Sequence, residues 1–280
     1  MDTPKLAQKP TTITFIGAGN MARSLIVGLL QDQANVVLRV ADPDEHQLDA
    51  IRKHWPEVTT STDNLDAMQG ADVVVLAVKP QIMRHVTENL ASHAQLSRPL
   101  FVSIAAGIRE EALNRWLGGN QAIVRCMPNT PALVQAGATG LYANPHVSDL
   151  QRSAAESLLR AVGITVWFDD ETQLDAVTAI SGSGPAYFFL VMEAMQAAAE
   201  QLGLRPEEAH LLIVQTALGA AKLALESDDL PGELRQKVTS KGGTTEAALN
   251  VLTSGGLHDL FAQALQAAAS RSRELAAANS

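Results

Sequence analysis

The sequence has one cysteine, Cys126, few aromatic residues and no block of lysine and arginine. A single cysteine excludes an intrachain disulfide and is typical of proteins from a reducing compartment. The net charge of -9 and the lack of a basic cluster argue against nucleic acid and against polybasic membrane contact. The first residues form no apolar export segment, and no run of about eighteen apolar residues follows. We therefore expect a soluble, cytoplasmic protein.

Motifs for metal binding and for hydrolysis are also missing. The seven histidines show neither HxH nor HExxH spacing, and one cysteine makes no thiolate cluster, so we expect no metal site. No GxSxG elbow follows a strand-like run, which excludes the serine hydrolase arrangement. Cys126 ends an apolar run and has no neighbouring histidine base, so we interpret it as a core residue and not as a nucleophile.

The first part of the chain alternates short β-branched runs with helix-permissive stretches, the pattern of βαβ units around a parallel sheet. The run Val73–Val78 is apolar throughout, which indicates a central strand covered by helices on both faces. The sequence therefore predicts a doubly wound parallel sheet of the α/β class. The expected strands cover residues 12–16, 36–41, 73–78, 100–104, 122–126, 140–143 and 164–168.

From about Leu174 onward the β-rich runs vanish, and alanine, leucine, glutamate and glutamine dominate. A chain of 280 residues exceeds what one hydrophobic core usually organises. We expect two domains, residues 1–169 with the sheet and residues 170–280 all helical; a single large α/β domain is the alternative. The expected helices cover residues 174–202, with a break at 182–185, and residues 206–226, 231–238, 245–254 and 257–278.

One helical stretch of the second domain, Tyr187–Ala199, is apolar nearly all round, with Glu193 and Gln196 as its polar interruptions. Such a helix must be covered on most sides. Because a small helical domain has limited means to cover it, we expect subunit contacts through this domain. A core helix within one subunit is the alternative.

A glycine-rich turn follows the first expected strand and opens a helix. Gly17 makes the tight turn, Gly19 lets the backbone approach a pyrophosphate, and Ala22 permits close packing of helix on strand. The pyrophosphate then lies at the positive N-terminus of the helix. The pattern predicts a Rossmann-like dinucleotide-binding domain, with contacts from Gly17, Ala18, Gly19, Asn20, Met21 and Ala22.

Asp42 ends the second expected strand, about 25 residues after Gly17, where a carboxylate meets the adenosine ribose. A carboxylate there favours the free 2′-hydroxyl of NADH and repels the 2′-phosphate of NADPH. Asp42 also precedes Pro43, and aspartate before proline is a turn signal, so a structural role is the alternative. The sequence leaves the preference between NADH and NADPH open.

Two further loops follow expected strands at the edge where open α/β sheets bind ligands. The first contains Ala77, Val78, Lys79 and Pro80, and the second is Ser103–Gly107. Lys79 is placed to donate to cofactor oxygens, although a solvated loop lysine is the alternative. The small residues of the second loop would let a nicotinamide lie against the backbone.

Three segments with small polar residues stand beside expected helix starts: residues 127–131, 181–187 and 238–245. Free N–H groups at helix starts, together with hydroxyls, can bind a carboxylate without a fixed cation. Helix capping explains any one of these segments, but their combination is unusual.

In this order, the motifs GAGNMA, AVKP, SIAAGI, MPNTP, SGSGPAY and VTSKGGTT resemble the pyrroline-5-carboxylate reductase family across essentially the whole chain. The last two are the more diagnostic, because many dehydrogenases share the first. The resemblance implies hydride transfer from NADPH or NADH to the C=N bond of 1-pyrroline-5-carboxylate, which gives L-proline in the last step of proline biosynthesis. It also implies a helical dimerisation domain, homodimers that often form larger rings such as decamers, and a substrate site shared between subunits.

The resemblance also assigns residues. Lys241 departs from the family, since many members carry proline there, and many relatives that use NADPH lack an acid at position 42. The substrate carboxylate would be bound by Ser240, Gly242, Gly243, Thr244 and Thr245, with Glu171 and Thr178 near the substrate. Further cofactor contacts would come from Asn64, from Ala77, Val78, Lys79 and Pro80, and from Ile104, Ala105 and Ala106.

A protonated cyclic imine needs an oriented hydride more than a strong acid or base. If a donor assists the nitrogen, Thr245 is the expected catalytic residue by family position. A β-hydroxyacid dehydrogenase is one alternative, but the lysine on which that class typically relies is absent from residues 181–195. A non-catalytic dinucleotide-binding regulator is another, and it would have no need of a second, carboxylate-suited site.

Overall fold

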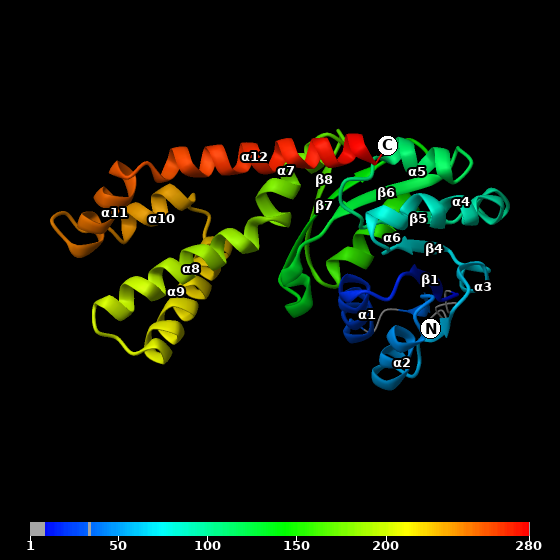
Figure 1. Cartoon of the computed structure of the whole chain (residues 1–280), viewed down its shortest axis with the longest axis horizontal. Helices are drawn as coiled ribbons and strands as arrows, with labels where there is room; N and C mark the ends of the chain where they lie inside the picture. Colours follow the sequence, from blue (N-terminus) through cyan, green and yellow to red (C-terminus); the bar gives the residue numbers. More distant parts are fainter. Residues whose placement is uncertain (1–8, 33–34, 280) are drawn as a thin grey trace, which may run out of the picture. The chain divides into compact units, whose positions relative to one another are not determined.

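The computed structural model describes residues 9–32 and 35–279. The prediction that the N-terminus contains no export segment concerns residues that lie mostly outside the described residues. The chain forms two compact units, one made of residues up to Ser183 together with those from Ala268 onward, the other of Gly184–Ala267 (Figure 1). The domain boundary at residue 170 stays a prediction, since the compact units part at Gly184 and the end of the chain belongs to the first.

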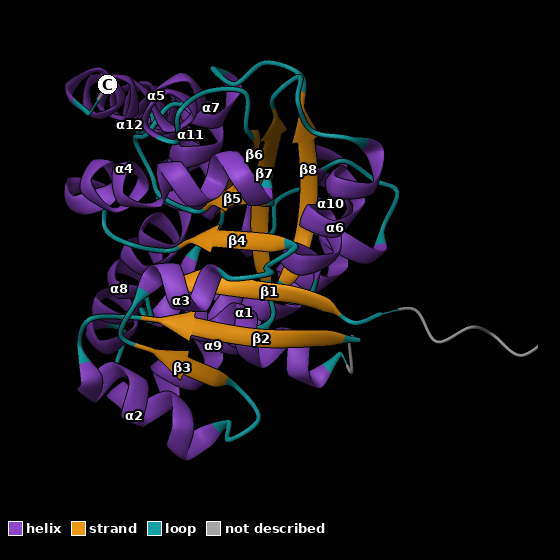
Figure 2. Ribbon diagram, turned by 90° about the vertical axis from the view of Figure 1, so that its right-hand side faces the viewer, coloured by secondary structure: helices purple, strands orange, loops and turns teal. Residues whose placement is uncertain are grey.

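The first unit contains an eight-stranded sheet in the order β3-β2-β1-β4-β5-β6-β7-β8 (Figure 2). Neighbouring strands run parallel except β6 and β7, so β7 and β8 form a reversed pair at one edge. The predicted α/β sheet is thus confirmed as mostly parallel. Its strands are β1 (Thr11–Ile16), β2 (Val36–Ala41), β3 (Thr59–Ser61), β4 (Val73–Leu76), β5 (Leu100–Ser103), β6 (Ala122–Met127), β7 (Gly137–Ala143) and β8 (Gly163–Phe168). The short strand β3 was not predicted, because its three polar residues carry no apolar signal.

Helices cover both faces of this sheet. One core lies under α1, α2 and α6, and the other lies under α3, α4 and α5. The helices of this unit are α1 (Asn20–Gln31), α2 (Glu45–His54), α3 (Asn64–Met68), α4 (Pro80–Ser97), α5 (Glu110–Trp116), α6 (Asp149–Arg160) and α7 (Gln173–Val177), with the single turns η1 (Thr130–Val134) and η2 (Thr178–Gly182).

The central strand β4 shows why a continuous apolar run is required. Val73 and Val75 face the first core, while Val74 and Leu76 face the second. All four side chains are buried, and burying each contributes about 1.5–3 kcal/mol relative to exposure. The prediction that this strand is covered on both faces is confirmed. The strand ends at Leu76, two residues earlier than the apolar run, so Ala77 and Val78 belong to the loop that follows.

The second unit is all helical, as predicted. Helices α8 and α9 pack against each other. The unit contains α8 (Gly184–Gln201), α9 (Pro206–Glu226), α10 (Pro231–Lys237), α11 (Thr244–Ser254) and the first part of α12 (Leu257–Ala278). The start of α9 was predictable because proline at the first helical position has no N–H to lose there.

The predicted break at residues 182–185 lies at the end of a π-helical turn, η2, which covers Thr178–Gly182. Ser183 donates its N–H to the carbonyl oxygen of Thr178, five residues earlier, over 2.8 Å. Helix α8 then begins at Gly184 and carries Pro185 in its first turn, where a missing N–H costs nothing. The glycine-rich segment therefore changes the pitch of the backbone between α7 and α8.

The apolar stretch of α8 is poorly covered within one chain. Phe188 and Phe189 are 68% and 64% exposed, and Leu211 of α9 is 69% exposed. Among the described residues of the second unit, burial is limited to Gly184, Ala209 and Ile213. Within the part of the chain that the structure describes, one helical stretch, Gln173–Gln201, is long and apolar enough to cross a membrane, which is weak support for a span. The exposed apolar area is what a subunit contact would cover.

Candidate active site

The glycine-rich turn between β1 and α1 is shaped by its first glycine. Gly17 has a φ of 105°, and a Cβ atom there would lie 2.8 Å from the carbonyl oxygen of Ala77. Its N–H donates to the carbonyl oxygen of Ala41 over 2.8 Å, which ties the turn to β2. Only glycine adopts this backbone at such close approach without strain. The turn thus joins the ends of three neighbouring strands.

The N-terminus of α1 is open. Gly19 is its N-cap residue, no side chain caps the helix, and the first turn has no acidic residue. A Cβ atom on Gly19 would meet nothing within 4 Å, so the space beside this residue at the start of the helix is open. Asn20 is exposed, Met21 is half-buried, and Ala18 and Ala22 are fully buried. This N-terminus has the space and the positive field that a pyrophosphate requires.

Asp42 lies against the same turn. One carboxylate oxygen accepts the N–H of Ala18 over 2.8 Å, and the other accepts the N–H of Asp44 over 2.9 Å. The side chain therefore has both a structural role and a position beside the glycine-rich turn. Each oxygen keeps a second lone pair for a further donor.

The remaining predicted cofactor residues follow the ends of neighbouring parallel strands. Paired strand-end residues, Ile16 with Leu76 and Leu76 with Ser103, place these loops at one edge of the sheet. Ala77 donates to the carbonyl oxygen of Ile16 over 2.8 Å, and Ile104 donates to that of Leu76 over 3.2 Å. Asn64 is half-buried at the start of α3, Val78 and Pro80 are half-buried, Lys79 and Ala106 are exposed, and Ala105 is buried. The structure thus brings the predicted cofactor residues to one edge.

The end of helix α12 packs on the loop after β5. A Cβ atom on Gly107 would lie 3.3 Å from Cβ of Leu275, and the Asn279 amide donates to the Gly107 carbonyl oxygen over 3.3 Å. Ser272 donates to a carboxylate oxygen of Asp175 over 2.7 Å. The last helix thereby supports the loop that contains the predicted residues 104–106.

Two of the three segments with small polar residues, 127–131 and 181–187, contact each other. The side-chain amide of Asn129 donates to the carbonyl oxygen of Ser181 over 3.0 Å, and its oxygen accepts the N–H of Ala138 over 2.9 Å. A Cβ atom on Gly182 would lie 2.5 Å from Cε of Met127. These contacts give residues 127–131 and 181–187 a packing role. A role of either segment in binding an anion stays a prediction.

Glu171 and Thr178, predicted near the substrate, are already hydrogen-bonded. Glu171 Oε1 accepts from Arg125 Nη1 and from the N–H of Glu110, each over 2.6 Å. Thr178 Oγ1 donates to the carbonyl oxygen of Leu174 over 2.7 Å. A role of either residue in substrate contact stays a prediction.

Sequence reasoning missed the buried ion pairs around Glu171. Arg125 is 7% exposed on β6, and burial lowers its pKa, an effect that the charge of Glu171 opposes. Arg109 Nη2 lies 2.6 Å from Asp175 Oδ2 in a second, adjoining pair. No sequence signal could have found them, because the partners are separated by 46 and 66 residues.

The predicted substrate segment, residues 240–245, lies in the second unit and covers the connection from α10 to α11 together with the first two residues of α11. Gly243 is the N-cap residue of α11, and no side chain caps this helix. The N–H of Gly242 donates to Glu246 Oε2 over 2.7 Å, and that of Gly243 donates to the carbonyl oxygen of Ser240 over 3.0 Å. Ser240, Lys241 and Thr244 are exposed, and Thr245 is half-buried. The start of α11 resembles that of α1 in having a glycine and no capping side chain.

Other chemistry finds no support among the described residues. Cys126 is buried, and burial raises the pKa of its thiol, which keeps it protonated and unreactive. Within residues 9–32 and 35–279, no group of three or more potential metal ligands occurs.

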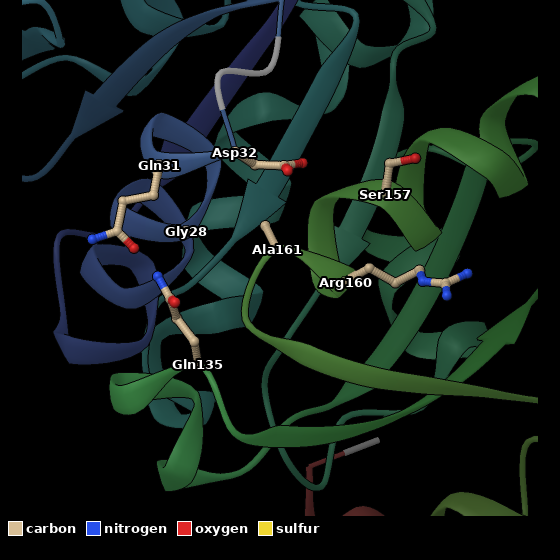
Figure 3. Close-up of a pocket in the computed structure, with 7 residues that line it drawn as sticks. All are labelled: Gly28, Gln31, Asp32, Gln135, Ser157, Arg160 and Ala161. Carbon is tan, nitrogen blue, oxygen red and sulfur yellow. The ribbon is translucent and has the colours of Figure 1, made fainter.

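A cavity of about 580 Å³ is lined in part by residues of α1 and α6 (Figure 3). It is lined by Gly28, Gln31, Asp32, Gln135, Ser157, Arg160 and Ala161. None of these belongs to the predicted cofactor or substrate residues, so the cavity adds nothing to the candidate site.

Comparison with known proteins covers both units. Residues 171–275 match the family described as pyrroline-5-carboxylate reductase dimerisation, and residues 12–107 match NADP oxidoreductase coenzyme F420-dependent. A pyrroline-5-carboxylate reductase of Pseudomonas aeruginosa is 52% identical over 277 residues, which cover 99% of this chain and 98% of that relative.

Solved structures agree. A pyrroline-5-carboxylate reductase from Coxiella burnetii is 48% identical, with a TM-score of 0.90 and coverage of 95% of this chain and 98% of that chain. A Plasmodium falciparum pyrroline carboxylate reductase with NADP bound is 27% identical, with a TM-score of 0.82 and coverage of 96% and 99%. Since half of the residues are shared with a relative matched over nearly its full length, this chain belongs to the pyrroline-5-carboxylate reductase family.

Proposed function

We propose that this protein transfers a hydride from NAD(P)H to the C=N bond of 1-pyrroline-5-carboxylate and so forms L-proline, the last step of proline biosynthesis. The observation that carries the proposal is a pair of helix N-termini with glycine N-caps and no capping side chain, at α1 and at α11. Each suits an anion, one the pyrophosphate of a dinucleotide and the other a substrate carboxylate. A non-catalytic regulator would need only the first.

The edge of the sheet fits a reduced dinucleotide. The open space before Gly19 would receive the pyrophosphate, Asp42 would face the ribose, and the loops 77–80 and 104–106 would line the path to the nicotinamide. When bound, the nicotinamide supplies the hydride. The residues of the chain orient the two reactants and need not supply a strong acid.

The loop 240–245 would bind the substrate carboxylate. The N–H groups at the start of α11 and the hydroxyls of Ser240, Thr244 and Thr245 are the available donors. Glu246 holds the N–H of Gly242 in this structure, so a substrate carboxylate that used this N–H would have to displace Glu246. Lys241 is exposed beside this loop, and its charge would attract the carboxylate at longer range.

Thr245 is the proposed donor to the imine nitrogen. The Thr245 hydroxyl would donate to the lone pair of the unprotonated imine nitrogen and so orient it. That nitrogen becomes more basic as the hydride adds to carbon, and it then takes its proton from solvent. Thr245 lies in the first turn of α11, where its half-buried side chain is held by a regular helix.

The Thr245→Ala variant is expected to lose about tenfold to a hundredfold in kcat/KM, because a hydrogen bond to a charged group contributes about 1.5–3 kcal/mol. Thr245→Ser should keep most of the activity, and Thr253→Ala, in the last turn of the same helix, should keep all of it. Steady-state kinetics with varied pyrroline-5-carboxylate measure the three variants. Full turnover and unchanged KM for Thr245→Ala would remove this residue from the mechanism.

The protein works as an oligomer in this proposal. The exposed apolar side chains of α8 and α9 would be covered by a second copy, as the matched dimerisation family indicates. We propose a homodimer that assembles further into a decamer in the cytoplasm, without nucleic acid or membrane partners. Light scattering at micromolar concentration should give at least a dimer mass, and a clean monomer would contradict this part of the proposal.

The reaction itself is tested with purified protein, pyrroline-5-carboxylate and either NADH or NADPH, by the loss of nicotinamide absorbance. Turnover with formation of proline, identified by mass spectrometry, is the expected result. If folded protein binds dinucleotide but shows no turnover with either cofactor, the proposed substrate is wrong.

A further inference from the structure

The corner between β2 and α2 lies where a dinucleotide-binding sheet places a carboxylate next to the adenosine ribose. The Asp42 carboxylate is fixed at both oxygens, by the N–H of Ala18 in the glycine-rich turn and by the N–H of Asp44. It therefore cannot rotate away from the turn without losing two hydrogen bonds. Because one lone pair on each oxygen is left over, the carboxylate is placed to accept from ribose hydroxyls.

The same corner has few donors to offer a phosphate. Pro43 has no N–H, and the N–H of Asp42 donates to the carbonyl oxygen of Ser61 over 3.2 Å. The N–H of His46 donates to the Asp44 carboxylate over 3.0 Å, and the N–H groups of Gln47 and Leu48 donate to the Asp44 carbonyl oxygen. A 2′-phosphate would find these backbone donors in use.

The N-termini of α1 and α2 differ in charge. Helix α1 begins without a capping side chain and without an acid in its first turn. Helix α2 is capped by Asp44 and carries Glu45 in its first turn, so carboxylates already occupy its positive end. With Asp42, three carboxylates flank the connection. The carboxylates at the start of α2 would repel a doubly charged phosphate. The start of α1 has no acidic residue and can bind a pyrophosphate.

Two arginines contact this corner, and both are already engaged: Arg52 Nη2 lies 3.2 Å from Glu45 Oε1, and Arg23 binds neutral oxygens. Arg23 Nε donates to the carbonyl oxygen of Ala18 over 3.0 Å, and its Nη2 donates to Gln47 Oε1 over 2.7 Å. The guanidinium thus links the glycine-rich turn to α2 through neutral oxygens. Arg23 holds the corner together and is not displayed as a phosphate ligand.

We infer that Asp42 makes this enzyme prefer NADH: the carboxylate accepts from the ribose 2′-hydroxyl and, with Asp44, repels the 2′-phosphate of NADPH. The inference rests on the proposed function only in that a reduced nicotinamide dinucleotide is the hydride donor. It separates this chain from the Plasmodium falciparum structure, which has NADP bound.

The test is a calorimetric titration of the full-length protein with NADH and with NADPH, without any imine. We expect NADH to bind at least about tenfold more tightly, a difference of about 1.4 kcal/mol. In Asp42→Asn, which keeps an oxygen for the N–H of Ala18, the two dissociation constants should converge, with weaker NADH and tighter NADPH. Asp42→Ser also removes the charge, and the two dissociation constants should converge in this second variant as well.

Glu57→Gln is the matched control, because it removes a negative charge from an exposed position after α2 and should leave the ratio unchanged. Arg23→Met should affect both cofactors alike, since both need the turn that Arg23 supports. Equal or tighter binding of NADPH by the unmodified protein would overturn the inference, and so would a selective loss of NADPH binding in Arg23→Met or an unchanged ratio in Asp42→Asn.

The experiments can refute the proposed reaction and the inferred NADH preference independently of each other. Preferential NADH binding without turnover on pyrroline-5-carboxylate would refute the proposed function and leave the inference standing. Turnover on pyrroline-5-carboxylate, with NADPH as the tighter-binding cofactor, would support the proposed function and refute the inferred preference for NADH.

Discussion

Replacing Arg125 by methionine is expected to lower the free energy of unfolding by about 3–5 kcal/mol. The guanidinium is 7% exposed and donates to Glu171 over 2.6 Å. Without it, the Glu171 carboxylate would stay mostly buried, and its Oε1 atom would keep only the N–H of Glu110 as a partner and no counter-charge. Guanidinium chloride unfolding at one fixed protein concentration measures the change, because oligomer stability depends on concentration.

Two variants make this result specific. Arg84→Met removes the same side chain from an exposed pair with Glu88, and should cost only about 0.3–0.5 kcal/mol. The double variant Arg125→Met with Glu171→Met removes both charges and should recover much of the loss, because a buried pair replaced by apolar residues is often neutral. Unfolding of Arg125→Met at the unmodified protein's midpoint would show that the buried pair does not stabilise the fold.

Two alanine substitutions in the glycine-rich turn are expected to separate folding from dinucleotide binding. Gly17→Ala places a methyl group 2.8 Å from the backbone oxygen of Ala77 at a φ of 105°. The left-handed backbone alone costs an L-residue about 1–2 kcal/mol, and relief of the clash would shift the loop 77–80. We expect lower thermal stability together with loss of dinucleotide binding.

Gly19→Ala is the second of these two variants and is expected to affect dinucleotide binding without affecting stability. Its φ is −68°, and a Cβ atom there would meet nothing within 4 Å of the protein. The fold should keep its stability, while the methyl group fills the space that the pyrophosphate needs and weakens NADH binding at least about tenfold. Differential scanning calorimetry and NADH titration measure the two effects, and undiminished NADH affinity in Gly19→Ala would place the pyrophosphate elsewhere.

Several elements could be predicted from the sequence because local rules determine them. The run Val73–Leu76 is apolar at every position, which only a strand covered on both faces requires. Helix α9 begins at Pro206, where proline fits the first turn, and the turn at Gly17 needs a glycine. The strand β3 escaped prediction because its residues, Thr59–Ser61, form a strand only by pairing with β2.

By itself, the sequence determined the class of the protein and its chemistry. Periodicity, glycine spacing and the order of six motifs suffice for an α/β sheet, a dinucleotide turn and a family, because these depend on residues that are neighbours in the chain. The tertiary structure alone decided how distant residues share their hydrogen bonds. In the folded chain, Arg125 donates a hydrogen bond to Glu171, and Asn129 donates one to the carbonyl oxygen of Ser181. The tertiary structure also fixed Asp42 against Ala18, since hydrogen bonds join groups that are close in space and not in sequence.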